Sequence, residues 1–278
     1  SWDNFYSKTL PRIHPDHVIV HTDLIKEQAV RFGDVRREHI SAIGIPQYDS
    51  HFSKNGVRSK DEFIRSIGGD PSKKLILYAF SGKASLSVDF DILDILYNAI
   101  QNGEIPSGVQ VLVRPYPRYD IPKERLDIFK EKYGFLAESS MAHVGGGGET
   151  WEFDARSLTL LENSLAHADL VITVYSTFFI EAAIYDTSLI GIAFDGYKTF
   201  DYWNSARRFF DWDHLADIRP LGGIALASSR GHLVRSINEL LENPARYKEK
   251  RRAIVDQQCQ FTDGKSGERL ARAILNYI

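Results

Sequence analysis

The chain has little cysteine and little methionine, and it has no long apolar run. Among its 278 residues, Cys259 and Met141 are the only members of their types. One cysteine excludes an intrachain disulfide and a cysteine-based zinc site, which fits a reducing, cytoplasmic setting. No apolar run approaches the roughly 20 residues that a membrane span needs. Because the sequence begins with Ser1 and not with methionine, we expect a fragment or a processed chain.

An excess of positive charge is also missing. Lys and Arg number 34 against 37 Asp and Glu, which gives a formal net charge of −3. This balance argues against nucleic acid as the main ligand. The basic run 246–252 leaves peripheral contact with a membrane surface open. Such runs are more often the solvated face of a helix.

Several motifs of well-known enzyme classes are absent. The sequence contains no GxxxxGK[ST] loop, no GxGxxG turn and no GxSxG elbow. P-loop chemistry is thereby excluded, and a nicotinamide, flavin or α/β-hydrolase site is disfavoured. We also find no carboxylate pair after a strand and no Cys or His cluster with ligand spacing. We therefore predict neither a metal site nor a cofactor in these residues.

The most informative segment is 168–194. Leu170 to Val174 is apolar and β-branched, typical of a strand buried on both faces. Hydroxyl residues follow, then an apolar helix over 178–185 and a second apolar strand over 189–194. This βαβ pattern predicts a parallel sheet, and open parallel sheets bind ligands beyond the carboxyl ends of their strands.

The rest of the chain repeats this alternation and predicts an α/β fold. Strands are expected at 17–21, 39–45, 75–80 and 109–114. Helices are expected at 23–32, 61–67, 90–102, 122–133, 156–167, 231–242, 244–258 and 266–278. Segments 47–60 and 139–150 are expected to be a connector and a long loop, and 197–221 is aromatic-rich and irregular. We predict the end of an N-terminal Rossmann-like domain at 1–55, a linker at 56–73, and a Rossmann-like domain with a parallel sheet at 74–278.

Candidate phosphate-binding residues follow the predicted strands. The candidates are Ser81, Gly82, Lys83, Arg114, Tyr175, Ser176, Thr177 and Lys265. Glycine permits close approach of a phosphate, Arg and Lys neutralise it, and a helix start attracts it. Each has a structural alternative: a surface lysine, an arginine paired with an acid, or hydroxyls and a turn that only cap helices.

Glu181 is the single acid on an otherwise apolar helix. A buried carboxylate is costly without a partner. A ribose diol and a neighbouring Arg or Lys are the two partners that we consider, and the residues alone do not decide between them.

Short motifs in order along the chain resemble a known family. They are Ser1-Trp2-Asp3-Asn4, Gly44-Ile45-Pro46-Gln47-Tyr48-Asp49, Arg114-Pro115-Tyr116-Pro117, Ser176-Thr177 with Glu181-Ala182, and Asp263-Gly264-Lys265-Ser266-Gly267-Glu268-Arg269. Together they resemble bacterial GT-B transferases of surface-polysaccharide synthesis, near the CDP-glycerol glycerophosphotransferases.

The resemblance implies two Rossmann-like domains, with the larger part of the first lying upstream. It implies that Glu181 holds the donor ribose and that Ser176 and Thr177 lie near the donor phosphates. Asp3 is the one visible acid near the expected cleft, and we take it as the candidate catalytic residue. Tyr116 departs from the pattern, because relatives often have histidine there.

The resemblance also implies the function that we expect. A nucleotide sugar or a CDP-polyol would be the donor, as a substrate and not a cofactor, and a glycan or a lipid-linked molecule would be the acceptor. Two alternatives stay open: a nucleotide-sugar epimerase on the same fold, and a non-catalytic nucleotide- or glycan-binding module.

Overall fold

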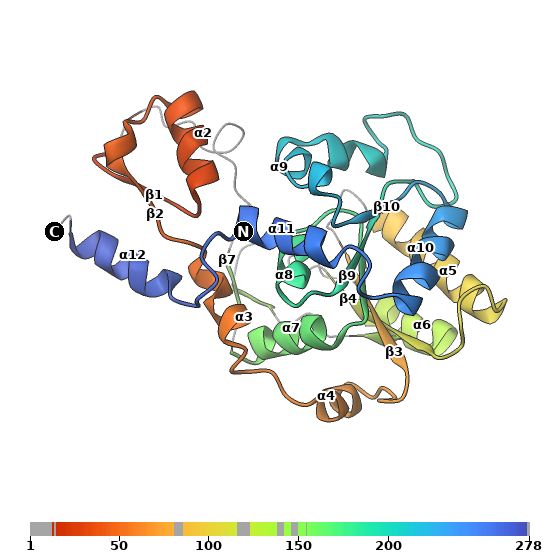
Figure 1. Ribbon diagram of the computed structural model, residues 1–278. Helices are drawn as coiled ribbons and strands as arrows, with labels where there is room; N and C mark the ends of the chain where they lie inside the picture. Colours follow the sequence, from red (N-terminus) through yellow and green to blue (C-terminus); the bar gives the residue numbers. More distant parts are fainter. Residues whose placement is uncertain are drawn as a thin grey trace.

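The computed structural model describes residues 13, 15–80, 86–115, 123–137, 142–145, 150–153 and 155–276. Figure 1 shows a small N-terminal unit beside a larger α/β domain. Within the described residues, no helix is both long enough and apolar enough to cross a membrane.

The N-terminal unit is a short βαβ step. Strand β1 (Val18–Val20) pairs in parallel with β2 (Ile40–Ala42), and α2 (Asp23–Gly33) connects them. Thr22 caps α2 by accepting a hydrogen bond from the Ile25 amide. The unit has a small apolar core of its own, formed by Val20, Ala29, Val35 and Ile40. The predicted strand–helix–strand order is confirmed, although the second strand is shorter than expected.

The larger domain is built on a six-stranded parallel sheet in the order β10-β9-β8-β3-β4-β5. Its strands are β3 (Lys74–Ala79), β4 (Val109–Arg114), β5 (Leu136–Ala137), β8 (Leu170–Thr173), β9 (Ser188–Ile192) and β10 (Ala225–Ala227). Leu75, Val111, Ile172 and Ile190 are buried on these strands, as predicted. Long apolar β-branched runs form the centre of the sheet because it is covered on both faces.

Helices cover both faces of this sheet (Figure 1). One layer contains α5 (Leu86–Gln101), α6 (Lys123–Tyr133) and α10 (Arg230–Glu242), and the other contains α7 (Ala155–His167), α8 (Phe178–Ile184) and α11 (Lys248–Gln258). The core between sheet and helices is one continuous cluster of buried apolar side chains. The strand order, renumbered from β3, is the 3-2-1-4-5-6 order of a dinucleotide-binding fold.

Several predicted loops contain regular structure. The expected connector at 47–60 includes η2 (Pro46–Tyr48) and α3 (Asp49–Ser53), ahead of α4 (Lys60–Ser66). The prediction of a long loop at 139–150 was wrong in part, because β6 (Ala142–Gly145) lies within it and pairs antiparallel with β7 (Thr150–Phe153). The aromatic stretch contains η4 (Ala206–Asp211), α9 (Asp213–Ala216) and η5 (Arg219–Leu221). Short elements like these are fixed by tertiary packing and leave no long periodic pattern.

The last helix, α12 (Ser266–Leu275), returns to the N-terminal side of the molecule (Figure 1). The Asp49 carboxylate accepts hydrogen bonds from the amides of Ser266 and Gly267, at 2.9 and 2.8 Å. Gly44, at φ +92°, must be glycine because a Cβ there would collide with the Ser266 hydroxyl. The motifs at 44–49 and 263–269 therefore form one structural contact, which we call the terminal clasp.

Replacing Asp49 with alanine should destabilise the protein. The change leaves two amides at the start of α12 without their acceptor, and loss of an N-terminal cap costs about 1–2 kcal/mol. Urea unfolding of D49A and wild type measures this free energy. The control is D256A, which removes an exposed i,i+4 pair with Arg252 and should cost at most about 0.5 kcal/mol. Equal stability of D49A and D256A would show that the clasp contributes nothing.

Candidate active site

The sheet has one topological switch point, between β3 and β8. From β3 the chain moves outward through β4 to β5, and it then returns to the other side of β3 as β8 before continuing to β9 and β10. Connections leave the two central strands in opposite directions, which opens a crevice at their carboxyl ends. Phe80 follows β3 there, and Val174 to Thr177 follow β8.

Arg114 lies beside this crevice at the carboxyl end of β4. Its backbone is paired with β3, where Ala79 is its partner in register, and its carbonyl accepts the Phe80 amide at 3.0 Å. The side chain is 92% buried, and the guanidinium carbon lies 5.9 Å from the centre of the Phe178 ring. The predicted cation is thus brought to the first residue of α8.

The hydroxyl residues after β8 form the start of α8, as predicted. Ser176 Oγ accepts a hydrogen bond from the Phe178 amide at 3.3 Å. Thr177 is the N-cap residue, but its own side chain makes no capping bond. Only one of the two hydroxyls is therefore used to cap the helix. Both residues are half-buried, which leaves them accessible at the edge of the sheet.

Tyr175 contributes to an aromatic wall beside the crevice. Its ring stacks on Phe209 with centroids 4.0 Å apart, and Trp212 packs edge-on at 5.4 Å. Asp195, just beyond β9, accepts hydrogen bonds from the Ser205 hydroxyl and the Ala206 amide at 2.9 and 2.7 Å. These bonds fix the segment that carries Phe209. The sequence indicated the aromatic richness of this segment but not that it packs on Tyr175.

Glu181 lies one turn into α8 and is 7% exposed. Neither an arginine nor a lysine is its partner in the part of the chain that the structure describes. The Tyr48 hydroxyl instead donates a hydrogen bond to Glu181 Oε1 at 3.5 Å, and His51 Nε2 lies 4.0 Å from Oε2. Tyr48 and His51 were missed as site residues, because their segment was interpreted as a connector. The resemblance motif that contains Tyr48 was the available signal.

The surroundings of His51 favour its neutral form. Its ring is 4% exposed, and Nδ1 lies 3.1 Å from the Tyr185 hydroxyl. Burial lowers the pKa of His51, and the nearby Glu181 and Glu162 carboxylates oppose this shift without cancelling it. The same acids and its own burial raise the pKa of Tyr185. The Glu181 carboxylate thus has a hydroxyl donor, Tyr48, and a buried imidazole beside it.

The remaining predicted residues are spread over the chain. Asp3 and the Ser81-Gly82-Lys83 turn lie outside the described residues. Lys265 is exposed at the N-cap of α12, next to the terminal clasp, and its amide donates to Asp263 Oδ1 at 3.2 Å. Asp49, which binds α12, directly follows Tyr48, which binds Glu181, so one short segment links Lys265 to the crevice.

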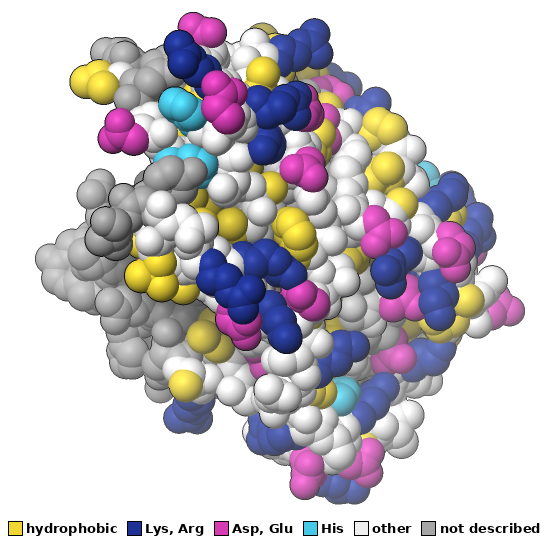
Figure 2. Space-filling view, turned by 60° about the vertical axis from the view of Figure 1, so that its left-hand side comes forward, with side chains coloured by type: hydrophobic (Ala, Val, Ile, Leu, Met, Phe, Trp, Pro, Cys, Tyr) yellow, Lys and Arg dark blue, Asp and Glu magenta, His cyan; other side chains and the backbone are white. Residues whose placement is uncertain are grey.

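Charge on the face that includes the N-terminal unit is mixed. Figure 2 shows Lys and Arg side chains gathered near the middle of this face with acidic side chains beside them. The described ranges contain no group of three or more His, Cys, Asp or Glu that could hold a metal ion.

The family comparison covers nearly the whole chain. Residues 8–276 match the model of the family described as CDP-Glycerol:Poly(glycerophosphate) glycerophosphotransferase. No curated protein has a significantly similar sequence.

Solved structures with the same fold include polymerases and epimerases. A variant of the wall teichoic acid polymerase TagF soaked with CDPG has a TM-score of 0.61 at 19% identity, covering 94% of this chain and 56% of that one. The Methanocaldococcus jannaschii UDP-GlcNAc 2-epimerase in complex with UDP-GlcNAc and UDP has a TM-score of 0.55 at 16% sequence identity. The match covers 95% of this chain and 61% of that one. S. aureus MnaA with UDP has a TM-score of 0.59 at 13% sequence identity, and the match covers 94% of this chain and 60% of that one. The chain therefore has a GT-B-type fold and spans little more than half the length of these structures.

The buried imidazole predicts an acid-sensitive fold. As the pH falls below about 6.5, the ordinary pKa of histidine, the unfolded chain takes up a proton at position 51 more readily than the folded chain, in which burial lowers the pKa of His51. The unfolded state then binds more protons, so stability falls as the pH is lowered. Urea unfolding at pH 7.5 and 5.5 should give a larger loss for wild type than for H51N. Parallel pH dependence of the two proteins would exclude His51 as the cause.

Proposed function

This chain belongs to the CDP-glycerol:poly(glycerophosphate) glycerophosphotransferase family, and we therefore propose that it carries the donor-binding half of a transferase that builds a cell-surface polymer. The observation that supports this best is the site itself. A buried carboxylate, Glu181, lies one turn beyond Ser176 and Thr177 at the switch point of a Rossmann-like sheet.

Each residue has a role in this proposal. Glu181 accepts the ribose hydroxyls of a nucleotide-activated donor, and Tyr48 and His51 hold its carboxylate in place. Ser176, Thr177 and the amides at the start of α8 face the donor phosphates, with Arg114 adding positive charge from β4. Tyr175 closes one side of the crevice. Lys265, the Ser81-Gly82-Lys83 turn and the catalytic candidate Asp3 complete the proposed site from the sequence.

The reaction is a displacement at the activated group. An acceptor hydroxyl forms the new bond to the phosphorus of a polyol phosphate and gives up its proton, for which Asp3 is the candidate base. The bond to the nucleotide breaks, and the nucleoside monophosphate leaves with the electron pair. Hydrogen-bond donors aimed at the leaving phosphate stabilise the charge that develops on it. A nucleotide sugar would instead lose a nucleoside diphosphate.

The acceptor is proposed as a glycan or a lipid-linked polyol phosphate at the cytoplasmic face of the membrane. The basic run 246–252 gives this location little support. Arg246 and Arg252 form exposed ion pairs with Glu239 and Asp256. Arg251 is buried against Asp186 and cannot contact a membrane surface.

An epimerase is the second candidate, favoured by the fold shared with the two UDP-bound structures. Incubation of the full-length protein with a nucleotide sugar and no acceptor separates the two. Epimerised product would support the second candidate, and release of nucleotide only when an acceptor is added would support the transferase.

The donor site is tested by nucleotide binding to E181Q. We expect a ligand among CDP, UDP, GDP and CMP to raise the melting temperature of wild type, since it binds the folded state. E181Q should bind that ligand about 1–3 kcal/mol more weakly, because a hydrogen bond to a charged group is lost. Its melting temperature without ligand should stay close to wild type, since the amide oxygen still accepts from Tyr48.

The matched control is E162Q, which alters a buried acid on α7. Its nucleotide affinity should equal that of wild type. Equal affinities for all three proteins, or gross unfolding of E181Q, would mean that Glu181 has a structural role only.

We further propose that the transfer needs no divalent metal, because Arg and Lys side chains neutralise the donor phosphates. Full-length enzyme in excess EDTA should keep its activity. Activity that EDTA abolishes and added magnesium or manganese restores would contradict this mechanism.

A further inference from the structure

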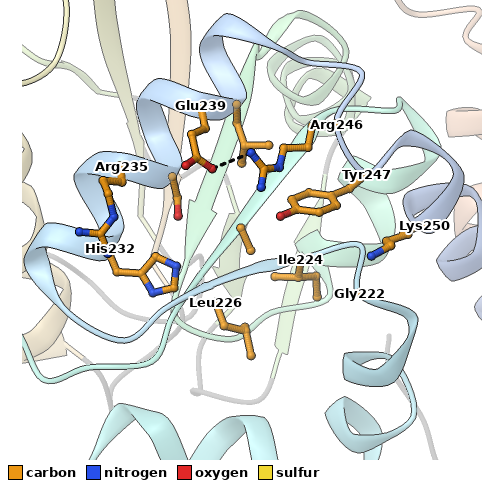
Figure 3. Close-up of a pocket in the computed structure, with 12 residues that line it drawn as sticks. Gly222, Ile224, Leu226, His232, Arg235, Glu239, Arg246, Tyr247 and Lys250 are labelled. Carbon is orange, nitrogen blue, oxygen red and sulfur yellow. Dashed lines mark ion pairs between the residues drawn. The ribbon is translucent and has the colours of Figure 1, made fainter.

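A groove lies away from the switch point, along the outer edge of β10. The cavity has a volume of about 470 Å³. Figure 3 shows that its lining comes from residues 222–226 on one side, α10 on another, and the turn before α11 at the end. We call it the edge groove. The groove is lined by β10, and β9 separates that strand from β8.

One stripe of α10 faces the edge groove. His232, Arg235, Ser236, Glu239 and Leu240 recur at spacings of three and four residues, which places them on one side of the helix. The opposite stripe, which includes Leu233, Ile237 and Leu241, is buried in the core. Leu240 and Ser236 are buried at the floor of this stripe, whereas His232 and Glu239 have exposed or half-buried side chains.

The closed end of the edge groove is held rigidly by a buried arginine. The Arg251 side chain is 1% exposed, and it donates hydrogen bonds to the carbonyls of Pro244 and Arg246 at 2.9 and 2.7 Å. The same guanidinium donates to Asp186 at 2.8 Å. These bonds fix the turn that presents Arg246 and Tyr247 to the groove.

Tyr247 is held in a backbone conformation that its side chain disfavours. It has φ +68° and ψ 14°, the left-handed region that glycine adopts more easily. Strained residues of this kind persist where the surrounding structure fixes them, and they cluster at binding sites. The Tyr247 ring lines the groove, as Figure 3 shows.

The charges in the edge groove suit an anion that also carries hydroxyl groups. Arg235 and Lys250 form no ion pair with any residue that the structure describes, whereas Arg246 is paired with Glu239 at 2.8 Å. The Arg246 and Lys250 cations lie 5.2 and 5.3 Å from the centre of the Tyr247 ring. Arg235 and Lys250 can bind phosphates, while Glu239 and Ser236 can bind hydroxyls. The Tyr247 ring offers an apolar surface to carbon atoms between them.

We propose that the edge groove binds a segment of a polyol-phosphate chain, with phosphates on Arg235 and Lys250 and the intervening polyol on Tyr247 and Glu239. The inference rests on the proposed function, since a transferase of this kind has such a chain as acceptor and product. The groove would hold the polymer at a distance from the reacting end.

Binding of a synthetic glycerol-phosphate oligomer to the full chain tests this proposal by calorimetry. The double variant R235A/K250A should bind the oligomer at least about tenfold more weakly, because each lost cation removes a charged hydrogen bond to phosphate. R252A, which changes an exposed arginine of α11 outside the groove, should bind it like wild type. Both variants should keep the wild-type affinity for the nucleotide and the wild-type melting temperature.

The outcomes distinguish this inference from the proposed function. Unchanged oligomer affinity in R235A/K250A would overturn the proposal that the edge groove binds the polymer, while the proposed donor site would not be affected. Equally tight binding of inorganic phosphate or of poly-glutamate would overturn the polyol-phosphate assignment, since neither contains a polyol. Loss of nucleotide affinity in R235A/K250A would also overturn it, because the two sites would then not be separate. Absence of nucleotide binding by wild type would contradict the proposed function instead.

Discussion

The short segment from Gly44 to His51 is the constraint on which the arrangement of this molecule depends. Tyr48 donates to Glu181 on α8, His51 packs against the same carboxylate, and Asp49 accepts the first amides of α12. The segment thereby brings α8 and α12, which are distant from it in sequence, to adjacent residues of η2 and α3. Because Glu181 is buried, its carboxylate needs polar partners, which these neighbours supply. A change in the segment therefore reaches the candidate donor site without touching the sheet.

The same segment explains why two motifs occur together in this chain. Gly44 leaves room for the Ser266 side chain. Gly264 has φ +69°, and a Cβ atom at this position would lie only 3.2 Å from the Asp49 carbonyl oxygen. These glycines and Asp49 serve the terminal clasp and not the chemistry directly. Lys265 lies at this contact, so its proposed role in binding phosphate depends on how the clasp positions the start of α12.

The sequence predicted the sheet well because the buried parallel strands leave strong apolar runs. Leu75, Val111, Ile172 and Ile190 could be placed in this way. The edge strands β5 and β10 were missed, since two- and three-residue strands carry no pattern of their own. At the candidate site, Arg114 and Ser176 were predicted from their places after strands, and Glu181 was predicted as the single acid of an apolar helix. Tyr48, His51 and the wall formed by Phe209 and Trp212 could not be, because they approach from segments whose packing is decided by tertiary contacts.

Hydrogen exchange tests the central claim, that the nucleotide donor binds beyond the carboxyl ends of β3 and β8. Backbone amides of the full chain should be followed with CDP-glycerol and, separately, with glycerol phosphate alone. The account predicts slower exchange over residues 174–182 when the nucleotide is present, and unchanged exchange over 222–250, which line the edge groove. Slower exchange confined to 222–250, with 174–182 unaffected by a bound nucleotide, would contradict it.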